Sequence, residues 1–344
     1  MRKGITVLYL FVLLAGFSLK AQTDHSGIAV TDKFIWVSTG RLHKFDKTTG
    51  ERLEKNSGSS VTYFLMTKDH KGNLVVAGSD HNIWRHIDQT NTREVLARFN
   101  GRPYGMVLDS RDNIYFITDK GIEEEQTGEV YFSNVSLNNQ IRIRDNWGNP
   151  YCYYIDKQDR IWLGFGYGEW GGNLFIFDTV SKTFLTPDLN DFRIALWPIK
   201  SFFEDNDAVY ASAGLQHMMT SGIIVRFDNL KASVLLESRE KMKDGNMAPG
   251  EYIGPATFSP ADSSIWFYSQ HGVFKGNKNK DLSKLENWQL IFKPKLSWQY
   301  GQPYAVGSPM NVTRLIAIDK TRFVLLSVND GAFYYDGTQF KKLD

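Results

Sequence analysis

Seven copies of one hydrophobic pattern follow one another along the chain. Each copy is an apolar run, a polar turn that usually contains Asp, and a second apolar run that usually carries Trp or Tyr. A period of roughly 40 to 50 residues indicates a repeat architecture, in which each unit buries its apolar face against its neighbours. The copies are IAVTDKFIWVST from Ile28, MTKDHKGNLVVAG from Met66, MVLDSRDNIYFIT from Met106, YYIDKQDRIWLGF from Tyr153, FFEDNDAVYASAG from Phe202, TFSPADSSIWFYS from Thr257 and IAIDKTRFVLLSV from Ile316.

The residues after each copy predict two further strands. Alternating apolar positions bounded by Gly, Asp, Asn and Thr, as in GRLHKFDKTTGERL and GNLFIFDTVSKTFL, are typical of antiparallel strands joined by tight turns. Four such strands per repeat around a central channel make a propeller blade. The sequence therefore predicts an all-β, seven-bladed β-propeller, with six or eight blades as the alternative. Equivalent second-strand positions are Trp36, Val75, Tyr115, Trp162, Tyr210, Trp266 and Val324.

The Asp and the aromatic residue of the repeat are expected to serve the structure. An Asp in a hairpin turn accepts backbone N–H bonds, and a Trp or Tyr on the second strand packs between blades. Helix is expected only in LLESREKMKDGN, from Leu235, between the fifth and sixth blades. The turn residues are Asp69, Asp109, Asp156, Asp205 and Asp319.

The beginning of the chain has a different pattern. Two basic residues precede an apolar stretch too short to cross a bilayer comfortably, and Ala21 stands before QTDHSG. This pattern predicts an export signal over residues 1–21 and a single propeller domain over residues 22–344. We expect a periplasmic or extracellular protein without a stable membrane span, and a retained membrane anchor is the alternative.

Charge and cysteine content exclude some functions. The 40 basic and 38 acidic side chains leave no cationic excess of the kind that binds nucleic-acid phosphates, so we expect no nucleic-acid partner. The single cysteine, Cys152, excludes an internal disulfide. It stands at the start of an apolar strand, where we expect a buried thiol and not a nucleophile.

The phrases VLDSRDNIYFIT and YIDKQDRIWLGF resemble the blade repeat of exported bacterial propellers, notably the two-component regulator propellers. They are also similar to the repeats of NHL proteins, of the gluconolactonase group and of streptogramin lyases. The resemblance covers nearly all of the chain after residue 21 and implies the fold alone, because one fold hosts many functions. The Glu-Gly-Pro and Pro-Asn-Gly motifs of gluconolactonases are absent, and IYFITDKG and IWFYSQHG stand where streptogramin lyases have Trp-Phe-Thr-Glu.

A candidate binding site is expected on loops at one end of the channel. Loops between second and third strands, and the segments that lead into each blade, should share one face. The first set is polar and the second is aromatic, which suits a small polar ligand such as a glycan, or a loop of a protein partner. The alternative is that the rings only close the channel mouth. The predicted ligand-binding residues are Asp80, His81, Tyr104, Asp119, Trp147, Tyr167, Trp170, Trp197, His217, Tyr252, Gln270, His271, Tyr304 and Asp330.

Two chemical alternatives concern the histidines. His81, His217 and His271 stand at equivalent positions of three blades and would bind a divalent cation if they converged, although we expect no metal and no cofactor. A His facing a carboxylate could abstract a proton. The preferred hypothesis is therefore a non-enzymatic binding propeller, and the alternative is a propeller hydrolase or lyase of the gluconolactonase or streptogramin lyase type. Its candidate catalytic residues are His271, His217, Asp119 and Glu169.

Overall fold

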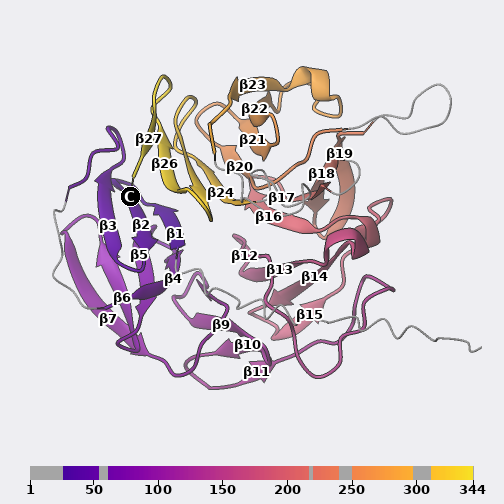
Figure 1. Cartoon of the computed structure of the whole chain (residues 1–344). Coiled ribbons are helices and arrows are strands. Elements are labelled where there is room, and N and C mark those ends of the chain that lie inside the picture. The colour runs from indigo at the N-terminus through magenta and orange to yellow at the C-terminus, as the bar shows by residue number, and fades with distance from the viewer. Residues whose placement is uncertain (1–25, 54–60, 217–219, 240–249, 297–310, 344) are drawn as a thin grey trace, which may run out of the picture.

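Seven antiparallel sheets stand in a ring around a central axis and form a seven-bladed β-propeller (Figure 1), as the repeat predicted. The computed structural model describes residues 26–53, 61–216, 220–239, 250–296 and 311–343. The predicted export signal lies outside these residues. Within each blade the strands follow in sequence order, and from blade 1 to blade 7 the first strands of successive blades contact one another.

Blades 1 to 4 make up the first half of the ring. In blade 1, Arg52 pairs with Phe45 in an isolated bridge at the place of a fourth strand. The strands are β1 (Ser26–Val30), β2 (Phe34–Thr39) and β3 (Leu42–Asp46); β4 (Tyr63–Lys68), β5 (Leu74–Gly78), β6 (Asn82–Ile87) and β7 (Thr92–Arg98); β8 (Gly105–Leu108), β9 (Ile114–Thr118), β10 (Gly121–Glu124) and β11 (Val130–Tyr131); β12 (Cys152–Ile155), β13 (Arg160–Gly166), β14 (Gly172–Asp178) and β15 (Thr183–Leu185).

Blades 5 to 7 complete the ring. Three short 3-10 turns lie in the described residues: η1 (Gly168–Trp170), η2 (Ile194–Leu196) and η3 (Leu285–Asn287). The helix expected from Leu235 is wrong where the structure describes it, because the segment up to Glu237 pairs with β18. The strands are β16 (Ile199–Glu204), β17 (Val209–Gln216), β18 (Thr220–Asp228) and β19 (Lys231–Glu237); β20 (Ala256–Ser259), β21 (Ser264–Ser269), β22 (Gly272–Asn277) and β23 (Gln289–Phe292); β24 (Val312–Ala317), β25 (Phe323–Ser327), β26 (Gly331–Tyr335) and β27 (Phe340–Lys342).

The apolar residues of the repeat are packed between blades, as predicted. Seven clusters of buried side chains each join two adjacent blades, and one of them joins blade 7 to blade 1. Trp162 of β13, for example, lies with its ring centre 5.9 Å from that of Phe202 and 5.2 Å from that of Phe227 in blade 5. The seven predicted second-strand residues all lie on second strands and are at most 5% exposed.

The ring has two faces with different loops. The turn face carries the hairpins between first and second strands. The loop face carries the loops between second and third strands and the segments that lead into each blade. These two sets of segments meet on the loop face, as predicted: the Trp147 N–H donates to the Asp119 carbonyl at 2.7 Å, and the Tyr252 N–H donates to the Gln270 side-chain oxygen at 2.7 Å.

On the turn face, the predicted Asp residues set their turns. One carboxylate oxygen of Asp156 accepts the backbone N–H groups of Gln158 and Arg160 at 2.9 and 3.0 Å. Its other oxygen accepts the Trp162 indole N–H at 2.8 Å. Asp69 and Asp109 accept the same pair of backbone bonds, and Asp205 and Asp319 accept theirs from the residues two and three positions later, so these carboxylates have structural roles.

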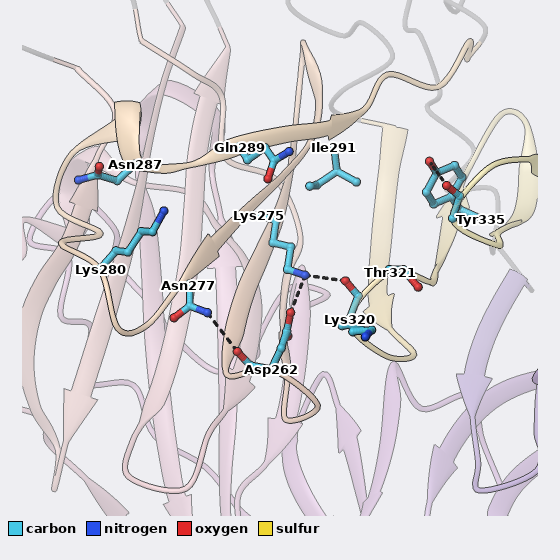
Figure 2. A pocket seen from close by; sticks show the side chains of 11 residues that line it. Asp262, Lys275, Asn277, Lys280, Asn287, Gln289, Ile291, Lys320, Thr321 and Tyr335 are labelled. Carbon is cyan, nitrogen blue, oxygen red and sulfur yellow. Dashed lines mark hydrogen bonds and ion pairs between the residues drawn. The ribbon is translucent and has the colours of Figure 1, made fainter.

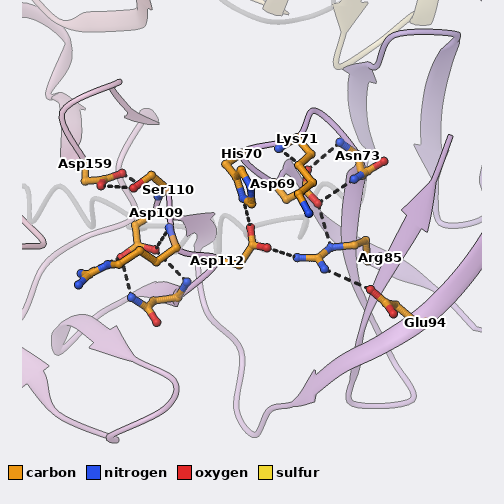
Figure 3. Close-up of polar contacts among 12 residues, drawn as sticks. Asp69, His70, Lys71, Asn73, Arg85, Glu94, Asp109, Ser110, Asp112 and Asp159 are labelled. Carbon is orange, nitrogen blue, oxygen red and sulfur yellow. Dashed lines mark hydrogen bonds and ion pairs between the residues drawn. The ribbon is translucent and has the colours of Figure 1, made fainter. Parts of the chain in front are cut away.

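Polar contacts on the turn face also join neighbouring blades. Asp112 of blade 3 accepts hydrogen bonds from Arg85 at 2.6 Å and pairs with His70 at 2.8 Å, both from blade 2 (Figure 3). Ser110 of blade 3 binds Asp159 of blade 4 through its backbone N–H and its hydroxyl. Contacts of this kind occur between every pair of adjacent blades, including Arg322 of blade 7 with the Thr48 carbonyl of blade 1. The turn face is therefore occupied by contacts that stabilise the ring.

Candidate functional site

The predicted binding residues that the structure describes lie on the loop face. His217 and Tyr304 lie outside the described residues. The others fall into three groups: rings packed into the core, polar side chains held by nearby backbone or side chains, and exposed side chains.

Three of the predicted aromatic residues are buried. The Trp147 ring is 3% exposed, stacks 4.9 Å from Phe175, and donates its indole N–H to the Ser133 carbonyl at 2.9 Å. Trp197 is 6% exposed and lies in the core between blades 4 and 5. Tyr252 is fully buried. Tyr104 and Tyr167 are half-buried against the core of blades 3 and 4, and burial raises the pKa of Tyr167 to about 12.

Several predicted polar side chains are held within the chain. Asp80 accepts bonds from the Asn82 amide groups and from the Trp84 indole at 2.9 Å. Burial alone would raise the pKa of Asp80, but these hydrogen bonds keep it below its usual value. Gln270 uses both ends of its amide, since its nitrogen donates to the Gly250 carbonyl at 3.3 Å. Asp330 accepts the Ser327 hydroxyl at 2.9 Å.

Four of the predicted residues are exposed on the loop face. They are His81, Asp119, Trp170 and His271, together with the catalytic candidate Glu169. Trp170 is 62% exposed on η1, which contacts η2 of the next blade. At Gly171, which has φ of +77°, a Cβ would lie 2.2 Å from the Ala195 carbonyl oxygen, so glycine is required for this contact.

A His and a carboxylate meet in blade 6. The His271 Nδ1 lies 2.6 Å from one Glu251 oxygen, and the Ser269 hydroxyl donates to the other at 2.8 Å. Glu251 is a residue that sequence reasoning did not select. No contact of His271 with Asp119 or Glu169 occurs in the described part of the chain, so the pairing is within one blade and does not cross the ring.

A lysine between two tyrosines marks the loop-face end of blades 4 to 6. Lys200 of β16 is 4% exposed. Its ammonium lies 4.1 Å from the ring centre of Tyr151, before β12, and 5.8 Å from that of Tyr252, before β20. Burial, and to a smaller extent the nearby Tyr151 phenol, raise the pKa of Tyr252 well above its usual value. Three consecutive blades thus contribute one residue each.

A bulge sets the direction of the Lys200 side chain. In β16, Ile199 pairs with Ala213 and Ser201 pairs with Ser212, so Lys200 is an extra residue between them. An extra residue of this kind leaves the ladder and re-aims its side chain. Beneath it, the hydroxyl groups of Ser201 and Ser212 lie 2.7 Å apart, and the Ser212 hydroxyl also donates to the Gly254 carbonyl of blade 6. These buried bonds fix the position of β16 relative to blade 6.

A second cation approaches the same region from blade 7. The Arg314 guanidinium of β24 lies 5.9 Å from the ring centre of Tyr153 in blade 4. Cys152, beside Tyr153, is buried as predicted, and burial raises the pKa of its thiol to about 12, against the lowering effect of Arg314 and Lys200. Both cations therefore lie close enough to act on one thiol of blade 4.

A groove also lies between blades 6 and 7 on the turn face, with a volume of about 480 Å³ (Figure 2). The side chains in it are mostly engaged with the chain itself: Lys275 pairs with Asp262 at 2.6 Å and with the Lys320 carbonyl. Asn287 donates to the Asp281 carbonyl at 2.7 Å. The groove is therefore a weaker candidate than the loop face.

Within the described ranges, no three His, Cys, Asp or Glu side chains come together in a way that could hold a metal ion. No helix among the described residues is both long enough and apolar enough to span a bilayer.

Comparisons with known proteins identify the fold. No protein-family model matches the chain. No curated protein matches it either. Similar solved structures include the β-propeller domain of Cps50 (Swd1) from Myceliophteria thermophila, with 12% identity and a TM-score of 0.56 over 91% of this chain and 97% of that chain. Hsv2 of Kluyveromyces lactis has 14% identity and a TM-score of 0.50, and the match covers 93% of this chain and 100% of that chain. U3-55K has 12% identity and a TM-score of 0.52, and the match covers 87% of each chain. At these identities the likeness shows a β-propeller and nothing finer.

Proposed function

We propose that this chain is an exported, non-enzymatic β-propeller that binds a small polar, glycan-like ligand on its loop face. The observation that carries the proposal is a set of enclosed polar atoms without hydrogen-bond partners at the loop-face ends of blades 5, 6 and 7. They are the Gln216 Oε1, the Tyr252 hydroxyl and the Asn311 Nδ2. A buried polar atom without a partner costs about 1–3 kcal/mol, and a polar ligand would supply the missing bonds once the side chains that cover these atoms move aside.

Neighbouring features support a glycan-like ligand. Tyr151 and Trp170, 38% and 62% exposed, offer flat apolar surfaces on which a sugar ring can lie. The signal-like residues 1–21 and the resemblance to exported bacterial sensor propellers support a periplasmic or extracellular location. A loop of a protein partner is the other occupant that this surface would suit.

A thermal-shift screen of neutral sugars, sugar acids, lactones and divalent ions tests the proposal. A solute that binds the folded chain at one hundred times its Kd stabilises it by about 2.7 kcal/mol, which is readily detected. Tyr252→Phe should weaken the shift while leaving the free chain at least as stable, because it removes an unpaired hydroxyl. Tyr210→Phe is the matched control: its hydroxyl binds Asp205 at 2.8 Å on the turn face, so it should lower stability and leave binding intact. A full screen without any shift would contradict small-ligand binding.

The contact between His271 and Glu251 favours a second candidate, a propeller hydrolase or lyase. A carboxylate orients an imidazole and stabilises its protonated form, which suits proton abstraction. If this function holds, the chain turns over lactones or sugar acids, and His271→Gln abolishes turnover without changing the melting temperature. Ligand binding without turnover contradicts it.

A further inference from the structure

Two lysines of the described chain are equally buried but differently partnered. Lys44 and Lys200 are both 4% exposed. The Lys44 ammonium donates to the Asn91 side-chain oxygen and lies 3.8 Å from the Phe34 ring centre. The Lys200 ammonium lies against tyrosine rings, and within the described residues it makes no hydrogen bond or ion pair. A ring face attracts the charge but offers no lone pair to the three N–H donors.

The Lys200 side chain keeps little exposed surface, 4% of the residue. The Tyr252 hydroxyl is among the enclosed polar atoms without a hydrogen-bond partner. The Tyr252 ring centre lies 5.8 Å from the Lys200 ammonium, so two neighbouring side chains carry donor groups without a polar partner in the described residues.

No carboxylate of the described residues pairs with the Lys200 ammonium. Arg314 adds a second cation, and the described part of the chain gives it no ion-pair partner. Two carboxylates of blades 5 and 6 are already bound: Glu251 to Ser269 and His271, and Glu204, at the far end of β16, to the Tyr154 hydroxyl and the Lys157 N–H. An anion from outside the chain would complete the site.

We propose that Lys200, flanked by the rings of Tyr151 and Tyr252 and with Arg314 as a second cation, binds the oxyanion group of a small molecule. This inference rests on the proposed function and names the ligand class, a sugar acid or a sugar phosphate. An oxyanion accepts several hydrogen bonds at once, whereas a neutral hydroxyl offers one oxygen and no charge to a buried ammonium. Separate probes distinguish the carboxylate of a sugar acid from the phosphate of a sugar phosphate.

The test measures thermal shifts of the purified chain with four probes at constant ionic strength: acetate, glucuronate, glucose 6-phosphate and glucose. The wild type should be stabilised by acetate and by one of the two sugar anions. Lys200→Met should lower the affinity for these anions, derived from the thermal shifts, at least tenfold. Without probes, Lys200→Met should melt at or above the wild-type temperature, because an unpaired buried charge is removed. Lys44→Met, the matched control, should melt lower and keep the response.

The outcomes separate this inference from the proposed function. If glucose binds with the same affinity to the wild type and to Lys200→Met, and no anion responds through Lys200, the chain binds a sugar but the oxyanion site is refuted. If acetate binds through Lys200 and no sugar does, the oxyanion site stands and the glycan-like function fails. Oxyanion responses no larger in the wild type than in Lys200→Met overturn the inference, as does a Lys200→Met chain that melts as low as Lys44→Met.

Discussion

The indole N–H of Trp162 donates a hydrogen bond to the carboxylate of Asp156 at 2.8 Å. These are the two most recurrent residue positions of the repeat, and in blade 4 they bind each other. The carboxylate is fully buried and also accepts the Arg160 Nε at 2.7 Å. The residues that repeat are therefore used to build the blade, and they are not free to act on a ligand.

Asp156→Asn should be strongly destabilising. The amide can accept fewer of the four bonds that reach this buried side chain, and its NH₂ group would face the indole N–H. We expect a loss of about 2–4 kcal/mol in the free energy of unfolding, measured by urea denaturation. Asp207→Asn is the control, since that side chain is 66% exposed, and it should change stability little. Equal effects of the two substitutions would refute the structural role.

Closure of the ring depends on Gly50. A Cβ at this position would lie 2.5 Å from the Tyr334 ring of blade 7, and the Tyr334 hydroxyl donates to the Thr48 carbonyl of blade 1 at 2.7 Å. Gly50 and Gly128 both have φ of +70°, but nothing lies within 4 Å of a Cβ at Gly128. Both alanine variants should suffer about 1 kcal/mol of backbone strain.

The difference between these variants reports the contact between blades 7 and 1. Gly50→Ala should be less stable than Gly128→Ala by a further 1–3 kcal/mol or so, the usual cost of overpacking. Urea denaturation measures both values. Stabilities that agree within error would show that the blades are not in contact at Gly50.

Acid should weaken the turn face through Asp319. Burial opposes ionisation, but the N–H groups of Thr321 and Arg322 and the Arg322 side chain lower the pKa of Asp319 from 3.8 to about 2. Because the folded pKa is the lower one, the ionised carboxylate stabilises the fold above the unfolded pKa, and this contribution is lost as pH falls through the folded pKa. Asp319→Asn should lower the melting temperature at neutral pH and show a smaller fall between about pH 4 and pH 2. If the melting temperatures of the wild type and of Asp319→Asn fall in parallel over that pH range, Asp319 does not cause the loss of stability in acid.

Cys152 should be chemically inert in the folded chain. Its thiol is 1% exposed, and burial raises its pKa to about 12, so very little thiolate exists at pH 8. Iodoacetamide should label it only after the chain is unfolded in urea, as mass spectrometry can show. Labelling of the folded chain at a rate close to that of free cysteine would contradict its burial.

The sequence predicted the ring well because its signals are local. Alternation of apolar residues and an Asp in each turn report strands and hairpins directly, and all seven second-strand residues from Trp36 to Val324 lie where expected. The same local reasoning gave a wrong helix at Leu235, since the charged residues there have high helix propensity. Pairing of this segment with β18 overrides that propensity.

The site was harder to predict because its contacts are not local. Glu251 and His271 stand in different loops, and no spacing rule relates them. The bulge that turns Lys200 out of β16 leaves no mark in the apolar pattern. Trp147, between Gly and Asn, has the sequence context of an exposed loop, yet Phe132 and Phe175 enclose its ring.

A crystal structure of the chain grown with glucuronate tests most directly whether the loop face binds the ligand. We predict the carboxylate within hydrogen-bond distance of the Lys200 Nζ, between Tyr151 and Tyr252. Glucuronate bound on the turn face, for example in the groove beside Lys275 and Gln289, or a loop face left empty at saturating concentrations of both glucuronate and glucose 6-phosphate, would contradict the account.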